Sequence, residues 1–161
     1  MEHRRASEKE PRELGSGLRQ LVGQELGPTS WLAVSQERID AFAAATDDPQ
    51  WIHVDSERAA AGPFGTTIAH GFLTLSLCVP MLHEALPPSG LTAINYGVNR
   101  VRFPAPVPSG ARVRGRFLVD SVDEAPGGEQ AVFVATVERE GGEKPVCVAE
   151  LVIRLLGPPV D

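Results

Sequence analysis

The spacing of hydrophobic and polar residues predicts one clear helix in the first half of the chain, over residues 35–48. Ile39 and Phe42 lie on one helical face, and Ser35 is suited to cap the N-terminus. The helix is expected to end at Asp48, because a residue that precedes proline avoids helical angles.

Shorter elements are predicted on both sides of this helix. Residues 11–27 carry leucines near helical spacing, but their glycines limit them to a short helix at most. Residues 29–35 have the composition of a strand. Residues 55–62 are expected to form one or two helical turns before glycine and proline break the chain.

The most apolar stretch covers residues 70–86 and predicts a helix that is buried on most of its sides. Pro80 lies within it, so the helix must kink there or rely on neighbouring groups to replace the missing backbone hydrogen bond.

Four later segments have the alternation and the turn residues of antiparallel strands. They cover residues 91–103, 111–122, 131–140 and 144–156. This order of elements predicts an α+β fold in which a curved antiparallel sheet wraps around the one buried helix. A single helix cannot cover both faces and the edges of such a sheet, so a homodimer or higher homo-oligomer is expected.

The composition agrees with a single domain. Of the 161 residues, 42% are hydrophobic and 22% are charged, which are the proportions of a globular protein with its own core. Residues 1–10 are charged and poor in apolar side chains, which predicts a disordered tail, and residues 11–161 then form the domain.

The net charge of −6 argues against a nucleic-acid partner, because phosphate backbones repel an acidic chain. No run approaches the roughly 18 apolar residues of a membrane helix, and the N-terminus lacks the apolar core of a secretory signal. A cytoplasmic protein without membrane association is therefore expected. Cys78 and Cys147 lie in apolar runs and are expected to be two buried thiols rather than a disulfide.

The candidate chemistry begins at a turn, where Asp48 and His53 are five residues apart. A carboxylate and an imidazole within a few ångströms of each other can hold a water molecule and move its protons. The spacing alone favours a plainer interpretation, a helix-terminal aspartate and an ordinary loop histidine.

Gly71 lies at the start of the apolar helix, where backbone N–H groups have no partner within the helix and the helix dipole is positive. Glycine lets a ligand approach the backbone closely, so a negative charge that develops on an oxygen could be stabilised there. Tight packing is the alternative reason for a glycine at this position.

Three further polar residues are weaker candidates. His70 is expected to cap or pack, and His83 to be structural. Ser76 could line a pocket or bond back to its own helix, and no GxSxG motif marks it as a nucleophile. The histidines match no metal-binding motif, so no metal is expected.

Arginines recur at a spacing of two in the strand region, which places them on one face of a strand. They are Arg100, Arg102, Arg112, Arg114 and Arg116. This face is either simply solvated or a site for the phosphates of a carrier such as coenzyme A.

The stretch TDDPQWIHVDSERAAAGPFGTTIAHGFLTLSL, residues 46–77, resembles the hydratase motif of the MaoC-like (R)-specific enoyl-CoA hydratases and dehydratases, which have the hotdog fold. Within that family it is most similar to the subgroup of nodulation protein N. The segment NYGVNRVRFPAPVPSGARVRG, residues 95–115, resembles the family's strand and turn after the central helix.

The resemblance implies catalytic roles for Asp48, His53 and Gly71: the first two would hold the water, and the backbone N–H of Gly71 would bind the thioester oxygen. Asp47 stands where many members have glycine, which leaves Asp48 as the catalytic carboxylate. In the widespread form of the motif, asparagine and proline occupy the positions of Gln50 and Trp51 here, which affects substrate range more than the reaction.

Four residues are expected to bind the substrate, namely Trp51, Ser76, Arg100 and Arg102. Trp51 could shorten or close the acyl tunnel. Ser76 is assigned with reserve, because the serine that some members carry in the central helix falls nearer to Val79 in this chain.

The reaction that the resemblance implies is the reversible hydration of a trans-2-enoyl thioester to an (R)-3-hydroxyacyl thioester. Coenzyme A or acyl carrier protein would be part of the substrate, and no separate cofactor is expected. Two alternatives stay open. A hotdog thioesterase would carry its acid on or beside the central helix, where only Glu84 stands, and a non-catalytic subunit would bind acyl-CoA or an acyl carrier without turnover.

Overall fold

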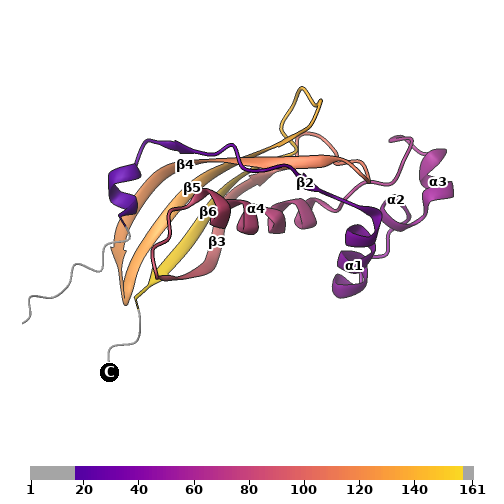
Figure 1. The fold of residues 1–161 in the computed structure, drawn as a ribbon. Coiled ribbons are helices and arrows are strands. Elements are labelled where there is room, and N and C mark those ends of the chain that lie inside the picture. Colours follow the sequence, from indigo (N-terminus) through magenta and orange to yellow (C-terminus); the bar gives the residue numbers. More distant parts are fainter. Residues whose placement is uncertain (1–16, 158–161) are drawn as a thin grey trace, which may run out of the picture.

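A curved antiparallel sheet wraps around one long helix in the computed structural model, which describes residues 17–157 (Figure 1). The helices are η1 (Leu18–Leu21), α1 (Gln36–Thr46), α2 (Trp51–Val54), α3 (Ser56–Ala60) and α4 (Gly71–Ala85). The strands are β1 (Glu25–Leu26), β2 (Leu32–Ala33), β3 (Thr92–Arg102), β4 (Arg112–Ala125), β5 (Gly128–Arg139) and β6 (Cys147–Leu156). The expected tail at residues 1–10 and the domain start at residue 11 lie outside the described residues.

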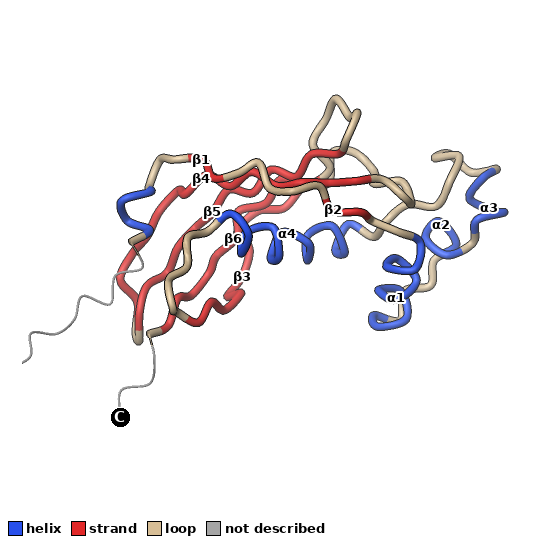
Figure 2. The backbone as a smooth tube through the Cα atoms, in the orientation of Figure 1, coloured by secondary structure: helices blue, strands red, loops and turns tan. Residues whose placement is uncertain are grey.

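The sheet has the strand order β1-β4-β5-β6-β3, with β2 as a further partner of β4, and all its pairings are antiparallel (Figure 2). The four long strands are those that the alternation predicts, and the α+β architecture is confirmed. The expected strand at residues 29–35 is much shorter, because only two of its residues pair with β4.

The core forms where α4 lies against the concave face of the sheet (Figure 1). Alternate residues of β4, such as Phe117 and Val119, are fully buried, and α4 contributes Met81 and Cys78 to the same cluster. Cys78 and Cys147 are both buried free thiols, as expected.

The helix α4 carries one exposed stripe, and for this stripe the expected burial is wrong. Phe72 is 70% exposed, and Ser76 and Pro80 are also exposed. These residues are four apart, so they follow one another along the surface of the helix that faces away from the sheet. Pro80 is tolerated within α4, and it lies on this exposed stripe.

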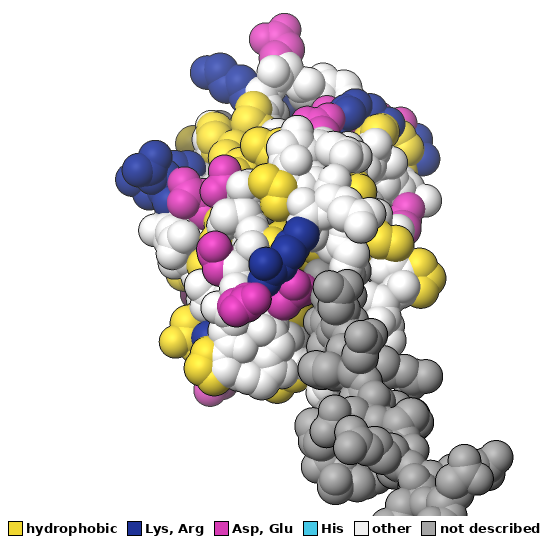
Figure 3. All heavy atoms as spheres, turned by 90° about the vertical axis from the view of Figure 1, so that its left-hand side faces the viewer, with side chains coloured by type: hydrophobic (Ala, Val, Ile, Leu, Met, Phe, Trp, Pro, Cys, Tyr) yellow, Lys and Arg dark blue, Asp and Glu magenta, His cyan; other side chains and the backbone are white. Residues whose placement is uncertain are grey.

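Helices α1, α2 and α3 gather beyond the N-terminal end of α4, on the right of Figure 1. The predicted helix α1 is confirmed, and Ser35 caps it by accepting a hydrogen bond from the Arg38 N–H at 3.3 Å. The opposite end of the molecule, drawn in Figure 3, shows basic side chains beside acidic ones rather than one basic surface. Within residues 17–157 no helix is long and apolar enough to cross a membrane.

Candidate active site

The turn after α1 is built on a left-handed residue. Asp47 has φ 54°, and both its own N–H and that of Asp48 turn back to the carbonyl of Ala43. This closes the helix with the geometry that glycine usually provides, which explains why glycine suits position 47. The reversal sends the side chain of Asp48 away from the α1 axis, where 54% of its surface remains exposed.

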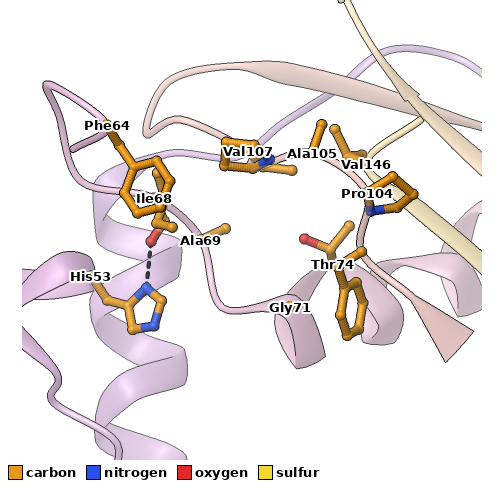
Figure 4. A pocket seen from close by; sticks show the side chains of 12 residues that line it. His53, Phe64, Ile68, Ala69, Gly71, Thr74, Pro104, Ala105, Val107 and Val146 are labelled. Carbon is orange, nitrogen blue, oxygen red and sulfur yellow. Dashed lines mark hydrogen bonds between the residues drawn. The ribbon is translucent and has the colours of Figure 1, made fainter. Parts of the chain in front are cut away.

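His53 lies in the single turn of α2 and is only 6% exposed. Its Nδ1 lies 2.6 Å from the carbonyl oxygen of Ile68 (Figure 4). A carbonyl can only accept, so Nδ1 carries the proton and Nε2 of the neutral ring is a free acceptor. The backbone of Ile68 also donates its N–H to the Ile52 carbonyl at 3.0 Å, so the two segments are joined twice.

Residues 67–69 connect this histidine to the rest of the fold. They pair with residues 107–109 through the bonds Ala69 N–H to Val107 O at 2.8 Å and Ser109 N–H to Thr67 O at 2.9 Å. The chain then enters α4 at Gly71. The position of His53 is therefore set relative to the N-terminus of α4.

Asp48 and His53 meet as their spacing allows. One carboxylate oxygen of Asp48 and one nitrogen each of His53 and His70 lie within 4.8 Å of one another. Two hydrogen bonds of about 2.8 Å that meet at one water span about 4.6 Å, so this separation suits a bridging water. The arrangement can hold a water between two proton acceptors.

Burial lowers the pKa of His53 below its usual 6.5, and a weaker repulsion from His70 acts in the same direction. The hydrogen bond to Ile68 and the charge of Asp48 oppose this shift but do not cancel it. His53 is consequently neutral at pH 7, and its Nε2 can accept a proton.

A cavity of about 320 Å³ extends from His53 to the N-terminus of α4 (Figure 4). Figure 4 shows His53, Phe64 and Ile68 at one end and Thr74, Pro104 and Val146 at the other. Apart from His53 and Thr74, its side chains are apolar. Such a cavity suits an apolar ligand whose polar group reaches the histidine.

Gly71 lines this cavity and begins α4, as expected. A Cβ at this position would come within 2.8 Å of the Phe103 ring, so only glycine lets the ring lie against the helix start. Both interpretations of the glycine therefore apply at one residue: it allows close packing, and its N–H belongs to the unsatisfied first turn of a helix.

Trp51 does not line the cavity with His53. Its indole packs against Gly62 and under the guanidinium of Arg58, which lies 4.5 Å from the ring centroid. Trp51 and His53 are separated by about 200° around the helical turn, so their side chains project to opposite sides. Trp51 supports the loop that carries Phe64.

Ser76 also lies away from this cavity. Its hydroxyl donates to the Phe72 carbonyl one turn earlier at 2.8 Å, and the residue lines a separate groove between α4 and β3. Thr74, two residues before it, faces the cavity with His53 instead. The sequence could not separate the two without the rotational phase of the helix.

The arginines divide into two groups. Arg112, Arg114 and Arg116 pair with Glu140, Glu138 and Glu25. No carboxylate of the described residues lies within ion-pair distance of Arg100 and Arg102, which are exposed near the end of β3. Only this second group is available to an anionic ligand.

A metal could in principle use Asp48, His53 and His70. The two imidazole rings, however, are stacked with centroids 3.7 Å apart and planes at 23°. The lone pairs of stacked rings point in nearly parallel directions instead of converging on one ion, as ligands at about 2.0 Å must. The geometry suits a held water better than a metal.

Sequence reasoning missed Phe64 and Phe103, and it gave His70 a capping or packing role. Phe64 and Phe103 line the cavity, and His70 contacts both Asp48 and His53. Phe103 directly follows the strand that carries Arg100 and Arg102, which was the available signal for it.

Known proteins resemble this chain in sequence and in fold. The sequence pattern of the "MaoC like domain" family matches residues 18–142. A 3-hydroxyacyl-thioester dehydratase Z from Mycobacterium tuberculosis is 53% identical over 135 residues, which cover 83% of this chain and 89% of the relative. Nodulation protein N from Rhizobium leguminosarum bv. viciae is 45% identical over 145 residues, covering 87% and 89%.

Solved structures show the same fold. The chain superposes on an (R)-hydratase from A. caviae involved in PHA biosynthesis with a TM-score of 0.67 at 29% identity, covering 83% of this chain and 96% of the other. An (R)-hydratase from Pseudomonas aeruginosa gives a TM-score of 0.69 at 25% identity, covering 87% and 91%.

The turn at Asp47 gives a prediction for stability. Replacing Asp47 by Ala should lower the free energy of unfolding by about 1 kcal/mol, because alanine is strained at positive φ, whereas Asp47→Gly should be neutral or stabilising. Urea denaturation at one fixed protein concentration measures both variants. Equal stability of the alanine and glycine variants would show that the left-handed conformation does not constrain this turn.

Proposed function

This chain belongs to the MaoC-like dehydratase family, and we propose that it catalyses the reversible hydration of trans-2-enoyl thioesters to (R)-3-hydroxyacyl thioesters. Its relatives are named as a 3-hydroxyacyl-thioester dehydratase and as (R)-hydratases, and the chain is accordingly a hydro-lyase. The stereochemistry and the roles of individual residues are part of the proposal.

One observation carries the proposal. One carboxylate oxygen of Asp48 and one imidazole nitrogen of His53 lie within 4.8 Å of each other, and His53 lines an apolar cavity that leads to the N-terminus of α4. A hydratase needs a held water, an acyl site and a group that polarises the thioester carbonyl, and these three features lie together here.

In the proposed reaction the water lies between Asp48 and Nε2 of His53. Its oxygen attacks C3 of the enoyl group, and its proton passes to Asp48 or His53. The C2=C3 electron pair moves toward the thioester oxygen, where the Gly71 N–H and the dipole of α4 stabilise the enolate. A proton from this pair of residues, the Asp48–His53 dyad, then reaches C2, which completes the addition of water.

The carrier portion of the substrate has two candidate binding residues near the cavity. Arg100 and Arg102 lie on β3 just before Phe103, which lines the cavity, and neither is paired with a carboxylate of the described residues. We include in the proposal that these two guanidinium groups bind the phosphates of coenzyme A or of the acyl carrier prosthetic group.

The thioesterase alternative is not favoured by the position of Glu84. This carboxylate is exposed near the C-terminal end of α4, where it accepts a hydrogen bond from the Ser30 N–H at 2.7 Å. It does not line the cavity that contains His53. Binding without turnover would instead favour the non-catalytic acyl-binding subunit.

The exposed face of β3 and α4 supports a homodimer as the working assembly. The strand β3 lies at the edge of the sheet, and nearly all of its residues are exposed. Ile94, Tyr96 and Val98 on this strand and Phe72 on α4 are among the large apolar residues left uncovered. A second copy that pairs along β3 would satisfy the free strand edge and bury this surface.

Activity of dyad variants tests the proposed function. Asp48→Asn and His53→Ala should each lower kcat/KM for trans-2-butenoyl-CoA hydration at least about 100-fold, because each removes a proton acceptor from the water. Asp47→Asn is the matched control, since Asp47 does not belong to the group formed by Asp48, His53 and His70, and it should stay within about threefold of wild type. Near-wild-type rates in either dyad variant, with folding verified by circular dichroism, would contradict these roles.

The pH dependence of the rate follows from the lowered pKa of His53. Neutral His53 is the active form, so kcat/KM should be constant near pH 7 and fall as the pH decreases through a value below 6.5. The rate is measured across pH 5–8 in buffers of constant ionic strength. An acid limb that lies above pH 6.5 would be inconsistent with a buried histidine base.

The assembly is tested by a pair of matched substitutions. Val98 and Val22 are exposed to the same degree, 46% and 45%, but only Val98 lies on β3. Val98→Lys should shift the protein toward a monomer in light scattering coupled to size exclusion, whereas Val22→Lys should leave the dimer intact. A wild-type protein that is monomeric at micromolar concentration would refute the dimer.

A further inference from the structure

His70 contacts both members of the dyad although it is 17 and 22 residues away from them in sequence. It is 3% exposed and directly precedes α4. Its Nε2 lies 3.0 Å from the backbone carbonyl oxygen of Asp48 and 3.9 Å from Oδ2 of the same residue. The carbonyl only accepts, so Nε2 of His70 carries the proton.

The ring of His70 also fixes the plane of His53. The two imidazoles are stacked with centroids 3.7 Å apart and planes at 23°. The Phe42 ring also packs against His70, with ring centroids 4.9 Å apart and planes at 54°. His53 is thereby held by its Nδ1 bond at one edge and by the His70 ring against its face.

The second ring nitrogen of His70 is buried without a partner among the described residues. This Nδ1 has no hydrogen-bond partner among residues 17–157, so a proton there would be an unsatisfied buried donor. The groups with titratable charge that face it are Asp48, from the end of α1, and His53, from α2.

We propose that His70 is a positioning residue of the hydratase. Through its Nε2–H it ties the main chain of Asp48 to the start of α4, and its ring supports the face of His53, so that carboxylate and imidazole keep their relative position. His70 itself neither touches the substrate nor takes up a proton in the reaction. This inference rests on the proposed function and adds a specific role within it.

Two variants separate the contacts of His70. His70→Gln keeps an N–H donor for the Asp48 carbonyl, and His70→Phe keeps a ring against His53 but has no donor. His70→Phe should lower kcat for trans-2-butenoyl-CoA hydration roughly 10- to 100-fold with KM within about threefold, because misplaced groups lose rate more than binding. His70→Gln should retain more of kcat than His70→Phe.

The control is His83→Gln, the same exchange on an exposed residue of α4 far from the dyad, and it should leave kcat unchanged. Wild-type kcat in His70→Phe would overturn the inference. So would a loss confined to KM, or equal losses of kcat in His70→Phe and His70→Gln.

A measurement on the wild-type protein is independent of variant folding. In a long-range ¹H–¹⁵N spectrum of ¹⁵N-histidine-labelled protein at pH 7, His70 should be the Nε2–H tautomer and His53 the Nδ1–H tautomer. An imidazolium or an Nδ1–H tautomer at His70 overturns the positioning role. Absence of hydratase activity in the wild type would instead remove the proposed function, whichever tautomer the spectrum shows.

Discussion

The hydrogen bond from Nδ1 of His53 to the carbonyl of Ile68 is the contact on which the site depends. It satisfies a polar atom of a nearly buried ring, fixes the neutral tautomer and leaves Nε2 as the acceptor. Because Ile68 belongs to the segment that pairs with residues 107–109 and then enters α4, the same bond ties the dyad to the sheet and to the helix terminus. Loss of this bond would free the histidine from the segment that leads into α4.

The polar groups of the candidate site lie close together beside a small apolar cavity. Asp48 is placed by the left-handed turn at Asp47, and Gly71 is placed by the packing of Phe103 against the start of α4. Each is fixed by a backbone constraint rather than by a long flexible side chain. In the proposed reaction, a pair assembled this way needs little reorganisation when substrate binds, which is the condition for strong electrostatic stabilisation.

The sequence predicted those parts that depend on local pattern. Ser35 and the apolar face with Ile39 predicted α1, the alternation predicted the four long strands, and the run from residue 70 predicted α4. The resemblance to the MaoC-like motif, rather than the spacing of Asp48 and His53 alone, predicted that these two side chains would meet. Cys78 was predicted to be buried from its apolar neighbours, as the structure confirms.

Features that depend on rotational phase or on distant contacts could not be predicted. Trp51 and Ser76 were expected at the substrate, but each is about 200° around its helix from the residue that lines the cavity. His70 was expected mainly to cap or pack, and its contacts with Asp48 and His53 could not be predicted because they come from elements remote in sequence. The exposed stripe on α4 was missed because an apolar run does not show which side a single chain leaves uncovered.

Incubation of the purified wild-type protein with trans-2-butenoyl-CoA in H₂¹⁸O tests the central claim most directly. The account predicts 3-hydroxybutyryl-CoA of (R) configuration with ¹⁸O at C3, and no release of free coenzyme A. Release of coenzyme A without a 3-hydroxyacyl product, or a product of (S) configuration, would contradict it.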